Sequence, residues 1–252
     1  MIRAGIRSGF TIIETMLFLA ISGGLTVMIL AGSGTMISQQ RYKDAASRTQ
    51  YLIQEQYAST VNTLNARQGS SWRCNPATGE VSQDSGEGVG AQWRGASECE
   101  IIGRFIQFNG NGREIITGNV TGYRFQATPS PTNDLQAFGQ YHLARMTEGS
   151  ESRPVSWGAS ITHPTSEAID NELILILRSP FSGTLRTFIT SAYHPFDGEA
   201  IIPNSLLASF NGRAVLCINP EGFSIGEKLG IVIEAGASGT SAIKQQASGS
   251  GC

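Results

Sequence analysis

Glu14 is the only charged residue between Phe10 and Ala31, a stretch that is otherwise almost wholly apolar. A carboxylate in lipid costs free energy unless it lies near the headgroups or finds a cation. The free amino group of a chain beginning at Phe10 would be such a cation, because it lies about one helical turn from Glu14. The chemistry that this spacing offers is an ion pair between neighbouring helices.

The other polar residues show no spacing that predicts catalysis or metal binding. The three histidines lie on different polar segments and are expected to be surface or structural residues: His142, His163 and His194. Asp84, Glu87 and Glu98 lack the regular oxygen alternation of a calcium loop, and no G-x-S-x-G motif is present. We therefore predict that the chain is not an enzyme and holds neither a metal ion nor a cofactor.

The four cysteines are Cys74, Cys99, Cys217 and Cys252. They form no CxxC pair and no Cys/His cluster with zinc-ligand spacing. Widely spaced cysteines in even number, behind a membrane-targeting segment, indicate disulfides in an oxidising compartment. Of the three possible pairings we favour Cys74–Cys99 with Cys217–Cys252, because each pair closes one local loop. Four reduced, partly buried thiols are the alternative.

The apolar segment around Glu14 has three interpretations. As a helix, Phe10–Ala31 would span about 33 Å, which matches the hydrocarbon core of a bilayer. The first interpretation is a signal peptide cleaved near Ala31–Ser33, although the stretch is long for one and carries a carboxylate. The second is a plain membrane anchor with Glu14 near the headgroups. Basic residues lie on both sides of the segment, so the positive-inside rule does not decide which end of the helix would face the cytoplasm.

The third interpretation rests on residues 38–64, which contain no Pro or Gly. One face there carries apolar and small side chains with helical spacing: Tyr42, Ala45, Ala46, Thr49, Leu52, Ile53, Tyr57, Val61 and Leu64. The helix is therefore expected to run from residue 10 to residue 64, over about 80 Å. Gly23, Gly24, Gly32 and Gly34 favour local melting or bending. Because one globular domain cannot bury that length, lipid or copies of the helix must cover residues 10–37.

The order Gly9-Phe10-Thr11-Ile12-Ile13-Glu14, after a short basic leader and before an apolar run, closely resembles the class III signal of type IV prepilins and type II secretion pseudopilins. The resemblance implies that residues 1–9 are a leader and that a prepilin peptidase cuts between Gly9 and Phe10. It further implies N-methylation of Phe10 and a role for Glu14 in docking into a growing filament.

The same resemblance implies partners and a location. The partners would be the prepilin peptidase, other pilin or pseudopilin subunits that pack through their helices, and an inner-membrane assembly platform. The protein would cross the inner membrane once, with its amino terminus inside, and then enter a periplasmic or extracellular filament.

Residues 65–252 predict a β-rich globular domain. Residues 65–99 are polar and Gly-rich and indicate a connecting loop. Strand-like segments follow at residues 99–108, 113–127, 172–179, 185–193, 213–219 and 229–235. Asn109–Gly112 predicts a hairpin turn between the first two. Residues 128–167 contain four prolines and predict a long excursion with little regular structure. The tryptophans of the loop-like regions are expected to pack at the core edge: Trp72, Trp93 and Trp157.

Together these patterns predict an α+β, pilin-like fold. A long amino-terminal helix, hydrophobic over 10–37 and amphipathic over 38–64, packs on a carboxy-terminal antiparallel β-sheet domain. The formal net charge of −2 does not indicate nucleic acid as a partner. The size of the globular part favours a minor pilin or pseudopilin, similar to the H type, in a type IV pilus or type II secretion-type filament. The alternative is a membrane-anchored or secreted β-domain binding module, similar to an adhesin.

Overall fold

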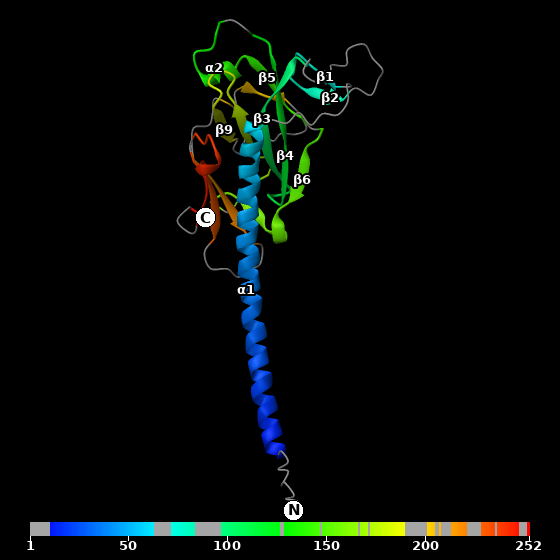
Figure 1. Ribbon diagram of the computed structural model, residues 1–252, viewed down its shortest axis with the longest axis vertical. Helices are drawn as coiled ribbons and strands as arrows, with labels where there is room; N and C mark the ends of the chain where they lie inside the picture. The colour runs from blue at the N-terminus through cyan, green and yellow to red at the C-terminus, as the bar shows by residue number, and fades with distance from the viewer. Residues whose placement is uncertain are drawn as a thin grey trace, which may run out of the picture.

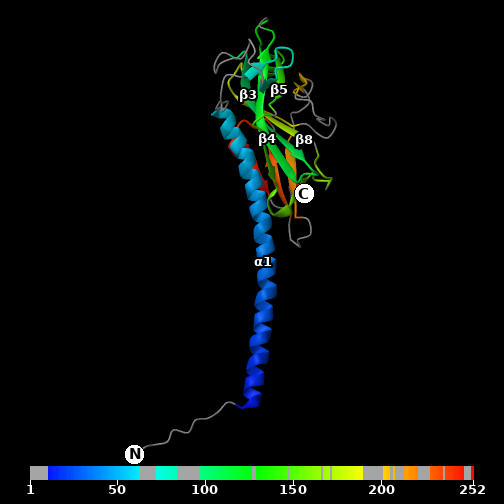
Figure 2. The same ribbon diagram turned by 90° about the vertical axis from the view of Figure 1, so that its right-hand side faces the viewer.

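The computed structural model describes residues 11–62, 72–83, 97–126, 129–146, 148–165, 167–170, 172–189, 201–204, 207, 213–220, 228–234, 236–246 and 251–252. Figure 1 shows one long helix, α1 (Ile12–Val61), whose carboxyl half packs on a β-rich domain while its amino half projects far beyond it. Figure 2 shows the same projection from the side. The predicted α+β fold, a long amino-terminal helix on an antiparallel sheet domain, is confirmed.

Helix α1 is continuous over 50 residues. It begins after the N-cap Thr11 and ends before Asn62, close to the predicted bounds of 10 and 64. The four glycines at which bending was expected are all helical, and a Cβ added at any of them would meet nothing within 4 Å. Each glycine lowers helix propensity by about 1 kcal/mol relative to alanine, but this does not interrupt the helix.

A seven-stranded antiparallel sheet forms the centre of the domain. Its strands are β3 (Cys99–Asn109), β4 (Glu114–Arg124), β5 (Tyr141–Arg145), β6 (Glu151–Pro154), β8 (Glu172–Arg178), β9 (Leu185–Ile189) and β10 (Ile201–Ile202). They follow the order β10-β5-β4-β3-β8-β9, with β6 paired to β4 beyond the end of β5. The hairpin predicted at Asn109–Gly112 joins β3 to β4.

A second antiparallel sheet has the order β13-β12-β11-β7. Its strands are β7 (Ser160–Thr162), β11 (Ala214–Asn219), β12 (Leu229–Ile233) and β13 (Ile243–Gln246). Shorter elements complete the described chain: strands β1 (Trp72–Cys74) and β2 (Val81–Gln83), helix α2 (Asp134–Phe138), and 3₁₀ turns η1 (Ser156–Gly158) and η2 (Thr240–Ala242).

The central sheet is covered on both faces, which explains the continuous apolar run of β8. Ile174 and Ile176 face a core that contains Ile53 and Tyr57 of α1 together with residues of β11 and β12. The alternate residues of β8 face a second core with Phe138 of α2: Leu173, Leu175 and Leu177. A strand buried on both faces loses the polar alternation that marks a half-exposed strand.

Two predicted irregular regions contain regular structure. Residues 65–99, predicted as a connecting loop, include the β1–β2 pair. Residues 128–167, predicted as an excursion, contain α2, β5, β6, η1 and β7. The second prediction was wrong because both β5, a mostly buried strand, and β6, a fully exposed one, are defined by their pairing with β4. Pairing with a neighbour overrides weak local propensity.

Candidate functional site

The carboxylate singled out by the sequence lies in the first turn of α1, where it forms a capping box with Thr11. The backbone N–H of Thr11 donates to Glu14 Oε2 at 2.9 Å, and the backbone N–H of Glu14 donates to Thr11 Oγ1 at 3.3 Å. These bonds satisfy orphan donors at the helix start. Gly9 and Phe10, the predicted cleavage and methylation residues, lie outside the described residues.

The amino half of α1 is apolar on every side, and none of its residues is buried by the described part of the chain. Its exposed large side chains are Ile12, Ile13, Met16, Leu17, Phe18, Leu19, Ile21, Leu25, Val27, Met28, Ile29, Leu30, Met36 and Ile37. The most apolar 18-residue window has a mean hydropathy of 2.0, and none of it is buried. By length and composition this helix is able to cross a membrane. We define residues 12–37 as the exposed segment.

Burial begins at Tyr42. Its hydroxyl donates to the backbone oxygen of Ile218 at 2.9 Å and accepts from the backbone N–H of Leu229 at 2.6 Å. Because these two residues are paired at the end of the β11–β12 ladder, the tyrosine joins the helix to the sheet where the ladder stops. Burial raises the pKa of Tyr42 above its ordinary value, so the hydroxyl stays protonated.

The helix face predicted to be buried is largely confirmed. Buried members are Tyr42, Ala45, Ala46, Thr49, Ile53 and Tyr57. Leu52 is partly buried, Val61 is exposed, and Leu64 lies outside the described residues. The sequence missed Gln56 and Thr60, which are polar yet buried. Gln56 is tolerated there because its Oε1 accepts a hydrogen bond from Arg104 Nε at 2.9 Å. Its helical spacing from Ile53 and Thr49 was the one sequence feature that indicated burial.

The four cysteines form two disulfides, Cys74–Cys99 and Cys217–Cys252. These are the pairs that local loop closure favours. The first joins β1 to the start of β3, and the second joins β11 to the last described residue. Both therefore hold peripheral segments against the two sheets.

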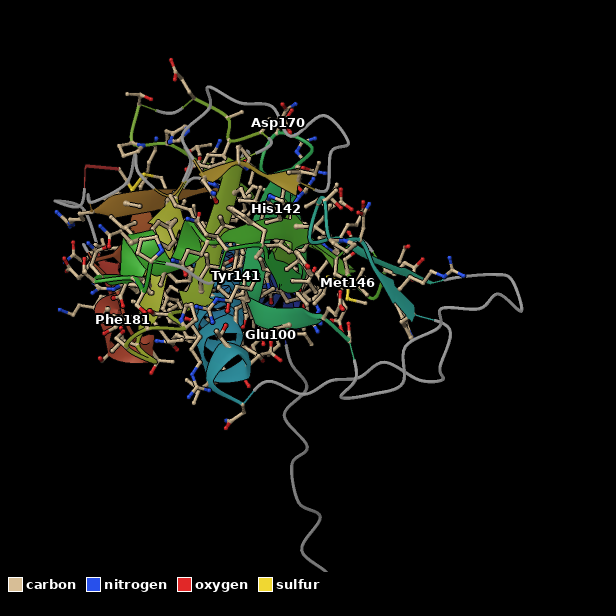
Figure 3. All side chains as sticks on the ribbon, turned by 90° about the horizontal axis from the view of Figure 1, so that it is seen from above. Glu100, Tyr141, His142, Met146, Asp170 and Phe181 are labelled. Atoms are coloured by element: carbon tan, nitrogen blue, oxygen red, sulfur yellow. A yellow bond between two sulfur atoms is a disulfide. The ribbon has the colours of Figure 1, made fainter. Side chains whose placement is uncertain are left out.

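The histidines are placed separately. His142 of β5 stacks on Phe125, with ring centroids 4.3 Å apart, and its Nδ1 lies 2.9 Å from the backbone oxygen of Pro76; Figure 3 labels it beside Tyr141. His163 Nε2 lies 3.3 Å from Glu172 Oε2. His194 lies outside the described residues. Among the described residues no group of three or more His, Cys, Asp or Glu side chains is arranged to hold a metal ion.

Glu172 is a buried carboxyl that the sequence did not single out. It begins β8 and is 5% exposed. Its Oε2 has no hydrogen-bond partner among the described residues, although His163 Nε2 lies 3.3 Å away. Burial raises the pKa of Glu172 to about 7, because desolvation disfavours the charged form. The only sequence feature that indicated its burial was its position at the start of an apolar strand.

A groove of about 1020 Å³ lies on the flank of the domain, between the carboxyl half of α1 and the segment that runs from β6 into η1. We call it the α1–β6 groove. Its buried lining residues are Thr49, Ile115, Val155 and Ala159, with Leu52 partly buried beside them. Charged and aromatic side chains from both walls complete the lining: Arg48, Tyr51, Glu55, Arg113, Arg153 and Trp157.

Three contacts join α1 to the segment that runs from β6 into η1 beside this groove. Trp157 Nε1 donates to Asp44 Oδ2 at 2.6 Å, and the Arg41 guanidinium lies 5.0 Å from the centroid of the Trp157 ring. The indole hydrogen bond is the main cause that lowers the pKa of Asp44 below its ordinary value. Farther along the helix, Arg153 Nη1 lies 3.8 Å from Glu55 Oε2. Trp157 was expected to pack at the core edge, and it packs on the helix while remaining 47% exposed.

Comparison of the chain with protein-family models, with curated proteins and with solved structures found no match.

Proposed function

We propose that the protein is a minor pilin or pseudopilin, a structural subunit that enters a type IV pilus or type II secretion-type filament through α1. The observation that carries the proposal is the exposed segment, apolar on all sides and unbroken, with Glu14 as its only charge. An apolar surface of this extent requires lipid or other chains around it. The prepilin-like order from Gly9 to Glu14 supports other copies of the helix as the final partners.

The length of the projecting helix supports a filament over a plain anchor. From Ile12 to Arg41, just before burial begins, α1 extends for about 45 Å. A bilayer core is about 30 Å thick, so a perpendicular anchor that begins at Ile12 would leave the exposed side chains of Met36 and Ile37 outside the hydrocarbon core. In a bundle of such helices, neighbouring chains would cover the whole length. The prepilin peptidase and an inner-membrane assembly platform are the partners that this function requires.

Glu14 has a defined role in this proposal. In the single chain its carboxylate accepts from Thr11. In the filament it would accept from the amino group of a neighbouring chain that begins at Phe10. A buried carboxylate is tolerated when such a cation compensates it.

Intact-mass spectrometry of the chain, produced in a host with a prepilin peptidase, tests the processing step. We expect a chain that begins at Phe10 and carries one added methyl group. A Gly9→Val variant is the matched control and should retain residues 1–9. A first residue near Ser33, as an ordinary signal peptidase would leave, would contradict the proposal.

The α1–β6 groove favours a second function, a membrane-anchored module that binds a ligand through its β domain. The groove is lined by exposed arginines and aromatic rings, which are enriched at binding sites. The two functions are compatible, because a filament subunit can also bind a partner.

A further inference from the structure

We propose that the α1–β6 groove binds an acidic peptide segment of another protein, and that this segment inserts an apolar side chain between the arginines. The groove lies on the carboxyl half of α1, outside the residues on which the filament proposal depends. The two proposals can therefore fail independently.

Charge is the first argument for an acidic occupant. Three arginines line the groove, Arg48, Arg113 and Arg153, against one acidic lining residue, Glu55. The charged lining residues are therefore net positive, whereas the chain as a whole has a formal net charge of −2. Guanidinium groups bind carboxylates in a two-pronged geometry. Two of these arginines already have acidic partners: Arg48 contacts Asp44 at 2.9 Å, and Arg153 contacts Glu151 at 2.5 Å and Glu55 at 3.8 Å. These ion pairs are solvent-exposed, so they contribute little and exchange readily with a ligand carboxylate.

Exposed aromatic rings are the second argument. Tyr51 is 67% exposed and Trp157 is 47% exposed, and both line the groove. Trp157 has a positive φ of 61°, which is rare for a bulky residue. Its indole is fixed by Asp44 and Arg41. A ring held in place before binding lowers the entropy cost of complex formation, and Trp, Tyr and Arg dominate the binding energy of protein interfaces.

The walls and the buried lining favour a peptide over a uniformly charged polymer. Leu52 and the exposed rings of Tyr51 and Trp157 provide an apolar surface that phosphates or uronates would leave unused. Pro154 has no N–H to offer along β6, so regular strand addition is disfavoured and recognition depends on side chains.

The distance between the Asp44–Trp157 contact and the Glu55–Arg153 contact sets the length of the expected peptide. Asp44 and Glu55 are separated by about 16 Å along the helix. An extended peptide of about five residues covers that distance. The expected ligand therefore has one central leucine or aromatic residue, and the acidic residues next to it face Arg48, Arg113 and Arg153.

Fluorescence anisotropy with the full-length protein in nonionic detergent tests the proposal. The probe is a labelled peptide of about seven residues with a central leucine flanked by glutamate and aspartate. A peptide with lysine in place of every acid is compared with it. We expect saturable binding of the acidic peptide only, weakened by raising the salt concentration because the contacts are ionic. Arg48→Glu and Arg153→Glu should each weaken binding about tenfold, and Trp157→Ala by a similar factor.

Lys43→Glu is the matched control, because it makes the same type of charge reversal on α1 at a residue that does not line the groove. It should change the affinity less than about twofold. Thermal melts of the variants confirm that the domain is folded in each. Equal binding of the lysine peptide, or equal weakening by Lys43→Glu and Arg48→Glu, would overturn the proposal. Preferential binding of a sulfated oligosaccharide or an oligonucleotide, lost in Arg48→Glu, would also overturn it and assign the groove to that polymer.

Discussion

The two halves of helix α1 have opposite surroundings although they belong to one continuous element. Ile29, in the exposed segment, is 69% exposed, whereas Ile53, in the carboxyl half, is completely buried. The carboxyl half finds its partners within the same chain, on β3, β8 and the second sheet. The amino half finds none among the described residues. The difference shows that one helix can be a core element at one end and an exposed apolar surface at the other.

Truncation of one isoleucine in each half tests this contrast most strongly. Ile53→Ala should lower the free energy of unfolding of the domain by about 2–5 kcal/mol, because it leaves a cavity in a closed core. Ile29→Ala should change it by less than about 0.5 kcal/mol. Denaturant titration of the full-length protein in detergent, followed by near-ultraviolet circular dichroism, measures both. Similar losses from the two substitutions would mean that the exposed segment contributes to the folded domain.

The two carboxylates in these regions provide a second contrast. Glu14 is exposed and hydrogen-bonded to Thr11, whereas Glu172 is buried and has a pKa raised from 4.5 to about 7. At any pH between 4.5 and about 7, the folded protein binds more protons at Glu172 than the unfolded chain does. Stability must therefore fall as pH rises from about 4.5 to about 7, by roughly 3 kcal/mol in total.

Glu172→Gln should remove that pH dependence. The substitution should stabilise the domain at about pH 8, where the wild-type carboxyl is charged, and change little at about pH 4. Urea midpoints at both pH values measure the difference, and Glu167→Gln, which changes an exposed carboxyl outside β8, is the control. An unaltered slope in Glu172→Gln would show that Glu172 does not cause the dependence.

Tyr42 lies at the junction between the exposed and the buried half of α1, and its substitution should have a smaller effect on the free energy of unfolding. Tyr42→Phe removes the hydrogen bonds to Ile218 and from Leu229. We expect a loss of about 1–3 kcal/mol, because an N–H and a carbonyl remain without that partner in a buried setting. Tyr51→Phe, on the same helix and exposed, should cost less than about 0.5 kcal/mol. Equal costs in unfolding titrations would refute the role of Tyr42 as the joint between helix and sheet.

Sequence periodicity was sufficient for the elements with strong patterns. The helix, the hairpin at Asn109–Gly112 and the apolar strands β3, β8, β11 and β12 were all predictable. Strand β6 was not, because its four residues are exposed and only the pairing with β4 defines it. Gln56 was missed since a polar side chain is buried only when a distant partner, here Arg104, is placed beside it.

The two candidate sites differ in the same way. Glu14 was identified from sequence because its signal is local, a single charge in an apolar run. The α1–β6 groove was not identified, because its walls come from residues 47–55 and 153–159, which only the folded chain brings together. The His163–Glu172 pair was missed for the same reason.

Incorporation of Glu14 variants into filaments tests the central claim most directly. Glu14→Ala removes both the helix cap and the assembly carboxylate, whereas Thr11→Ala removes the Thr11 hydroxyl from the cap and keeps the carboxylate. The fraction of each variant in sheared filaments is compared with its amount in the membrane. We predict normal membrane levels for both variants, with incorporation lowered about tenfold in Glu14→Ala and little changed in Thr11→Ala. Equal incorporation of Glu14→Ala and the wild type would contradict the account.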